Sequence, residues 1–114
     1  MPMIFKIIDA SAHQAATLSG QFSGAEIDLK DGYIHFSTAA QVAETAKRHF
    51  AGRSNLMLWA IDAEALGPAL KWEPSRGGQL FPHLYAPLGM QYVVWAKPLA
   101  WDGTAHVFPP EALA

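Results

Sequence analysis

The chain has 114 residues, of which 51% are hydrophobic, and it carries a formal net charge of −2. This length fits one hydrophobic core, so we expect residues 1–114 to form a single domain. The acidic balance argues against a nucleic-acid partner, because such proteins need a basic surface to neutralise phosphates. The absence of cysteine excludes disulfides, cysteine-ligated metals and a thiol nucleophile.

The sequence shows no signal for secretion or membrane insertion. The apolar segment at residues 3–8 is interrupted by Lys6 and lacks the form of a signal peptide. No run of about 20 apolar residues could span a bilayer. We therefore expect a cytoplasmic protein without a membrane partner. The low charged share of 16% is compatible with a ligand cleft or with a self-association surface, so the oligomeric state stays open.

The chain is expected to begin with a strand followed by a helix. Residues 3–8 form an apolar run typical of a buried strand. Asp9 and Ser11 signal a helix start, and Ser11 with Gln14 matches a capping box, in which two side chains satisfy free backbone N–H groups. A helix is therefore predicted over residues 11–18, and Gly20 is expected to end it.

The next segment carries the first candidate binding residues. Residues 21–32 are interpreted as a loop with a short strand near Ile27, and residues 33–37 as a second strand. Along such a strand His35 and Ser37 point to one face, while the apolar residues before each of them point to the other. That first face therefore presents a titratable ring beside a hydroxyl group.

A helix is expected to follow this strand at once. Thr38 begins a second capping-box pattern, and apolar residues at helical spacing continue to Phe50, with Gly52 closing the helix. The first N–H groups of a helix have no partners within it and favour anions. His35, Ser37 and Thr38 together therefore predict a polar ligand site.

The second half of the chain is expected to contain mainly strands. The expected elements are strands at residues 56–61, 70–73 and 92–99, a helical turn at 62–66, an ordered loop at 74–87 and a surface tail from residue 101. Residues 56–61 are strongly apolar and predict a central strand. Strands and helices mix without regular alternation, which favours an α+β fold.

A second candidate cluster lies in and beside the expected loop. Glu73 could stabilise a cation or act as a base, or could simply form an ion pair with Arg76. Arg76 precedes two glycines and could hold a phosphate or carboxylate, or could lie in a solvated turn. His83 lies between Pro82 and Leu84 in a constrained stretch.

Structural alternatives exist for the remaining candidates. His35 could be a buried strand histidine held by a backbone carbonyl, and Thr38 a helix cap rather than a ligand contact. Tyr85 could stack on an aromatic ligand or fill the core. None of the five histidines belongs to a short metal-ligand motif, so no metal site is predicted.

Four segments resemble the small bacterial family known as domain of unknown function 952. They are Ile-Phe-Lys-Ile near the start, Gly-Tyr-Ile-His-Phe-Ser-Thr at residues 32–38, Lys-Trp-Glu-Pro at 71–74 and Gly-Gln-Leu-Phe-Pro-His-Leu-Tyr-Ala-Pro-Leu at 78–88. That family is similar to the ADP-ribosyltransferase-like fold. The resemblance therefore implies a split antiparallel sheet, two main helices and a cleft for a nicotinamide dinucleotide.

The resemblance also implies roles for the candidate residues. His35 would be the early-strand residue that holds the dinucleotide, and Glu73 the later acid, so these two are the expected catalytic residues. The expected cofactor-binding residues are His35, Ser37, Thr38, Arg76, His83 and Tyr85. One reading is thus an NAD- or nucleotide-binding protein with ADP-ribosyltransferase-like chemistry. The alternative is a non-catalytic module that binds a small metabolite or forms a homodimer.

Overall fold

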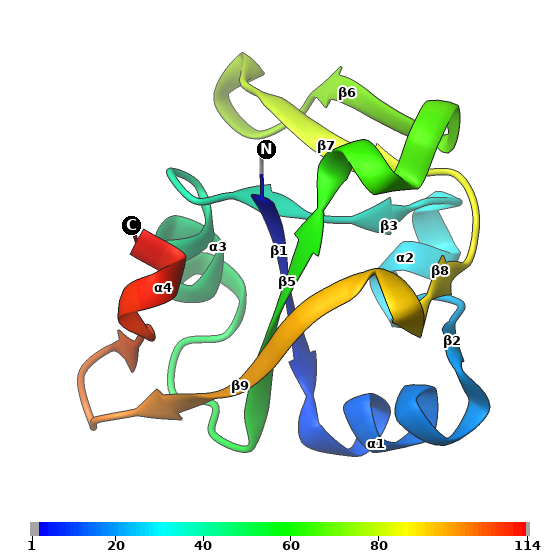
Figure 1. Ribbon diagram of the computed structural model, residues 1–114. Coiled ribbons are helices and arrows are strands. Elements are labelled where there is room, and N and C mark those ends of the chain that lie inside the picture. Colours follow the sequence, from blue (N-terminus) through cyan, green and yellow to red (C-terminus); the bar gives the residue numbers. More distant parts are fainter. Residues whose placement is uncertain (1–2, 114) are drawn as a thin grey trace.

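A five-stranded antiparallel sheet curls into a half barrel in the computed structural model, which describes residues 3–113 (Figure 1). The strands lie in the order β10-β9-β5-β1-β4. Their bounds are β1 Met3–Asp9, β4 Ser37–Thr38, β5 Leu56–Asp62, β9 Val93–Trp101 and β10 His106–Val107. The expected central strand at residues 56–61 is confirmed, because β5 lies in the middle and pairs with both β1 and β9.

Two smaller antiparallel sheets complete the α+β fold. One contains β3 (Ile34–His35), β7 (Leu80–Leu84) and β6 (Leu70–Pro74), and the other contains β2 (Gln21–Phe22) and β8 (Leu88–Gly89). The strand expected at residues 33–37 is divided between two sheets. Its first part, β3, pairs with β7, while its second part, β4, pairs with β1. Phe36 lies at this change of partner and donates its backbone N–H to the carbonyl of Pro82 at 3.0 Å.

Three main helices are present instead of the two expected. They are α1 (Ala10–Ser19), α2 (Glu26–Asp31) and α3 (Val42–His49), and α4 (Pro110–Leu113) is a single turn. The shorter 3-10 turns are η1 (Ala63–Ala69), η2 (Arg76–Gly78) and η3 (Met90–Tyr92). No helix in residues 3–113 is both long enough and apolar enough to cross a membrane.

The additional helix, α2, lies where a loop and a short strand near Ile27 were expected. The Asp28 carboxylate accepts the backbone N–H of Ala25 at 2.8 Å, which satisfies a free donor at the helix start. Gly32 ends the helix in the left-handed region, at a φ of 89°. Polar contacts at the two ends of α2 therefore decide its structure, rather than an apolar periodicity that the sequence could reveal.

The boundaries of two helices also differ from expectation. Helix α1 ends at Gly20 as predicted, but it begins after Asp9 and not with a Ser11 capping box. Helix α3 begins at Val42, and Thr38 is the last residue of β4. The Gln41 side-chain oxygen accepts the Thr38 N–H at 3.0 Å. This contact is the one that the capping pattern predicted between Gln41 and Thr38, but Thr38 lies before the helix, so the expected helix start at Thr38 is wrong.

The central sheet is buried on both faces, because alternate residues of its strands are apolar on each side. Ile4 and Trp59 belong to a cluster that packs with α1 and β2, whereas Phe5 and Leu58 belong to a cluster that packs with α3. The chain end contributes to the second cluster through the buried Ala112 of α4. Residues 101–111 are exposed or half-buried, as expected for a surface tail, whereas Ala112 is buried.

The expected loop at residues 74–87 is also corrected, because it contains η2 and the strand β7. Strand β7 pairs with β6 from Leu80 to Leu84, and His83 is its fourth residue. Four of the five residues of β7 are buried, so its sequence does not alternate between polar and apolar residues as a half-buried strand would.

Candidate functional site

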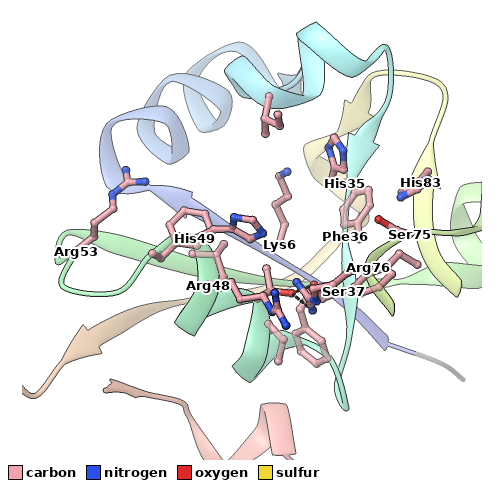
Figure 2. A pocket seen from close by; sticks show the side chains of 17 residues that line it. Lys6, His35, Phe36, Ser37, Arg48, His49, Arg53, Ser75, Arg76 and His83 are labelled. Carbon is pink, nitrogen blue, oxygen red and sulfur yellow. Dashed lines mark hydrogen bonds between the residues drawn. The ribbon is translucent and has the colours of Figure 1, made fainter. Parts of the chain in front are cut away.

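A cavity of about 860 Å³ lies where the edge of β1 becomes free (Figure 2). Strand β4 pairs only with Ile4 and Phe5 of β1, while β5 pairs with β1 along its whole length. The chain beyond β4 leads away to α3, and the chain before it belongs to the sheet with β7. The cavity therefore occupies the gap between two sheets. Its lining residues are Phe5, Lys6, Ile7, Ile27, His35, Phe36, Ser37, Val42, Thr45, Arg48, His49, Phe50, Arg53, Ser75, Arg76, Phe81 and His83.

Positively charged and imidazole side chains dominate the polar part of this lining. Four of the eight Lys and Arg residues of the chain and three of its five His residues line the cavity, and none of the lining residues is Asp or Glu. Figure 2 shows these side chains spread around the space. The remaining wall is largely aromatic and aliphatic. The cavity therefore suits an anion that also has an apolar part.

Carboxylates hold the arginines from outside the lining. Glu44 lies 3.7 Å from Arg48 and 3.5 Å from Arg76, and Asp9 pairs with Arg53. These ion pairs are exposed on at least one side, so they are weak and can yield to an incoming anion. The positive side chains are thus oriented by acids that do not themselves occupy the cavity.

Arg76 is the most constrained of these arginines. Its guanidinium carbon lies 4.9 Å from the centre of the Phe81 ring, and one terminal nitrogen donates to the Thr45 hydroxyl at 3.3 Å. Thr45 is in turn 2.8 Å from the hydroxyl of Ser37, which is buried. Ser37 therefore supports the wall that carries Arg76.

His35 lies between two carboxylates. Its Nδ1 is 2.6 Å from Asp28, and its Nε2 is 2.9 Å from Asp31. Only the doubly protonated ring can donate to both carboxylates at once. Asp28 also accepts from Lys6, whose Nζ lies 3.0 and 2.9 Å from the two carboxylate oxygens. Lys6 and Asp28 thus form a buried ion pair at the cavity wall, and the half-buried His35 lies beside it.

Glu73 lies on the far side of His83 from the cavity. One Glu73 oxygen accepts from His83 Nδ1 at 2.9 Å and from the Tyr85 hydroxyl at 2.7 Å. The hydrogen bond from Tyr85, followed by that from His83, lowers the pKa of Glu73. Tyr33 stacks on the His83 ring, with centroids 4.1 Å apart. Glu73, Tyr85 and Tyr33 thus surround His83 without lining the cavity themselves.

The structure brings only part of the expected site together. His35, Ser37, Arg76 and His83 line the cavity, whereas Thr38, Glu73 and Tyr85 do not. Sequence reasoning did not select Lys6, Asp28, Arg48, His49, Arg53 or Ser75 as site residues. A signal existed for some of them. Lys6 is the one charge inside an apolar strand, and the basic run at residues 47–49 ends helix α3.

The Tyr85–Glu73 contact predicts an unusual tyrosine titration. The hydrogen bond to Glu73 and the nearby negative charge raise the pKa of Tyr85 to about 12, whereas a free tyrosine titrates near ~10. Absorbance of tyrosinate against pH, compared with a Tyr85→Phe variant, should reveal this late step. In Glu73→Gln the pKa of Tyr85 should fall toward ~10. An unchanged late step in Glu73→Gln would contradict the assignment.

These features define a class of α+β protein with a cation-lined cavity at the free edge of a curled antiparallel sheet. Residues 7–96 match the family described as "Protein of unknown function (DUF952)", and the chain belongs to that family. The family resemblance read from the sequence is therefore confirmed. Its further likeness to ADP-ribosyltransferase-like folds stays a prediction.

Solved structures of one bacterial protein closely resemble this chain. The crystal structure of protein CC0527 from Caulobacter crescentus is 43% identical over 97% of this chain and 97% of that chain, with a TM-score of 0.92. The solution NMR structure of CC0527 is 45% identical over 93% of this chain and 91% of that chain, with a TM-score of 0.84. The chain matches none of the curated proteins.

Proposed function

We propose that this chain binds a phosphorylated small molecule of the nucleotide type in the cavity between β1 and α3. One observation carries the proposal: a chain with a net charge of −2 places half of its Lys and Arg residues, and no acid, around one cavity. Phosphate oxygens accept strong charge-assisted hydrogen bonds from arginine and lysine. The aromatic wall can contact a base or a sugar, and about 860 Å³ falls within the usual ~300–1,000 Å³ of small-molecule sites.

NAD is the dinucleotide that the ADP-ribosyltransferase-like resemblance would imply. In that case His35 would lie beside the dinucleotide and Arg76 would hold a phosphate group. ADP-ribosyl transfer through Glu73 would need its carboxylate in the cavity, but His83 and Tyr85 occupy that carboxylate outside the lining. The geometry therefore favours ligand binding over transfer catalysed by Glu73.

Calorimetric titration of the full chain with NAD, AMP and adenosine tests this proposal. We expect NAD and AMP to bind and adenosine to bind at least ~10-fold more weakly, because adenosine has no anionic group to meet the arginines. Higher salt should weaken the binding of AMP more than the binding of adenosine, because salt screens the attraction between the phosphate and the positive side chains. Absence of binding by both NAD and AMP at millimolar concentration, or equal binding of adenosine and AMP, would overturn the proposal.

Arg76→Gln is the most direct test of the phosphate contact. Loss of a hydrogen bond to a charged group costs ~1.5–3 kcal/mol, so the Kd for AMP should rise about 10- to 100-fold. Lys71→Gln is the matched control, because Lys71 is an exposed cation on the neighbouring strand β6 and does not line the cavity. An equal rise in the Kd for AMP in both variants would show that overall charge, and not the cavity, attracts the nucleotide.

A further inference from the structure

His83 is held in one orientation by its neighbours. The side chain is only 3% exposed, its Nδ1 lies 2.9 Å from a Glu73 oxygen, and Tyr33 stacks on the ring. The Tyr85 hydroxyl donates to the same Glu73 oxygen and so orients the carboxylate. A ring fixed in this way can present its remaining nitrogen in only one direction.

That remaining nitrogen, Nε2, reaches the cavity. Nε2 has no hydrogen-bond partner among the described side chains and backbone groups. No side-chain nitrogen or oxygen in this part of the chain is both fully buried and unpartnered, so Nε2 must contact open space. His83 lines the cavity and is otherwise enclosed, so the cavity supplies that space.

The neighbours of His83 also determine where its proton lies. An ionised carboxylate can only accept a hydrogen bond, so Glu73 places the proton of the neutral ring on Nδ1. Nε2 is then left with a free electron pair. Every Lys and Arg side chain in the lining can only donate, which makes Nε2 a hydrogen-bond acceptor among donors.

We propose that His83 Nε2 accepts a hydrogen bond from a hydroxyl group of the bound ligand, with Glu73 and Tyr85 as positioning residues. This inference rests on the proposed function and narrows its ligand class to phosphorylated compounds with a free hydroxyl, such as ribonucleotides. The arginines and Lys6 recognise the phosphate, and His83 recognises the hydroxyl. Glu73 thus acts through His83 and does not touch the ligand.

A thermodynamic cycle with AMP and 2′,3′-dideoxy-AMP tests the inference. Both nucleotides keep the phosphate and the base, but the second lacks the ribose hydroxyls. We expect the wild-type chain to bind AMP about 10-fold more tightly than the dideoxy compound. In His83→Asn, whose amide can still donate to Glu73 but lacks Nε2, AMP should bind only as tightly as the dideoxy compound. The dideoxy affinity itself should not change.

The outcomes separate this inference from the proposed function. Absence of binding by both nucleotides would overturn both. Equal binding of the two nucleotides by the wild type, or equal weakening of both in His83→Asn, would overturn only the role of His83. Nitrogen-15 NMR of the histidine rings provides a test without ligand, in which His83 should carry its proton on Nδ1 in the wild type and lose that preference in Glu73→Gln. A proton on Nε2 in the wild type would overturn the inference directly.

Discussion

Asp28→Asn should destabilise this protein by about 3–5 kcal/mol, measured by urea unfolding, because it removes the carboxylate that pairs with the buried Lys6. Asp28 is 2% exposed and Lys6 is 7% exposed. Besides Lys6, Asp28 accepts from the backbone N–H groups of Ala25 and His35 and from the His35 ring. The substitution keeps the shape of the side chain but replaces one acceptor oxygen by an NH2 donor, so the loss reports on the charge and on the hydrogen bonds that this oxygen accepts. Total stabilities are commonly ~5–15 kcal/mol, so this loss is a large fraction.

Two further variants distinguish a charge effect from general disruption. Asp31→Asn lies on the same helix and faces the same histidine, but both side chains of that pair are substantially exposed, so it should cost less than ~1 kcal/mol. Lys6→Met combined with Asp28→Asn removes the unpaired buried charge and should restore much of the lost stability. A double variant no more stable than Asp28→Asn would contradict the ion-pair explanation.

The same buried ion pair predicts acid sensitivity. Burial alone would raise the pKa of Asp28, but the His35 hydrogen bond and the Lys6 charge, with the Ala25 and His35 backbone donors, outweigh it and hold the pKa well below the usual range. A carboxyl group whose pKa is depressed by folding stabilises the folded state above its unfolded pKa of ~3.9. Stability should therefore fall as the pH drops below ~4, and this fall should be smaller in Asp28→Asn.

Trp59→Ala should cost about 3–5 kcal/mol, the range for removing a large aromatic side chain from a core. Trp59 is fully buried at the middle of β5. Its ring meets Phe22 edge to face, with centroids 5.1 Å apart, and its Nε1 donates to His13 at 2.9 Å. Trp59 thus connects the central strand to both β2 and α1. Urea unfolding followed by circular dichroism measures the loss without relying on the deleted fluorophore.

Two other aromatic substitutions show whether this loss arises from packing. Trp59→Phe keeps most of the ring contact but removes the hydrogen bond to His13, so a loss of stability of about 1–2 kcal/mol is expected. Trp72→Ala, on the exposed strand β6, removes a side chain that is 43% exposed and should cost less than ~1 kcal/mol. A Trp72 effect as large as that of Trp59 would contradict the placement of the core.

The central sheet could be predicted from sequence because its strands are apolar on both faces. Residues 3–8 and 56–61 form such runs, and both became strands buried on either side. Helix α2 was not predicted, because the Asp28–Ala25 contact and Gly32 define its two ends without an apolar periodicity, and Asp28 also pairs with Lys6, which is distant in sequence. Strand β7 was missed because Pro82 and the glycines before it are more typical of loops.

The candidate site, too, could be predicted from the sequence only in part. His35, Ser37, Arg76 and His83 are recognisable by residue type, and they do line one cavity. Their roles depend on partners that no local pattern reveals. Glu73 was selected as an acid for chemistry, but its contact with His83 across the β6–β7 pair keeps it out of the cavity. Arg48 of α3 and Arg53 of the segment after it join the site because the chain passes from the sheet with β7 to β1 at Phe36 and then continues into α3.

The arginines that line the cavity lie outside the hydrophobic core. The two hydrophobic clusters lie within the sheets and their covering helices, whereas Arg48, Arg53 and Arg76 project from a helix end and from turns outside both clusters. Substitutions at these three positions can change the charge and shape of the cavity with little effect on folding stability. Lys6, by contrast, belongs both to the cavity lining and to the buried pair that stabilises the fold, so the lining tolerates change at its arginines but not at Lys6.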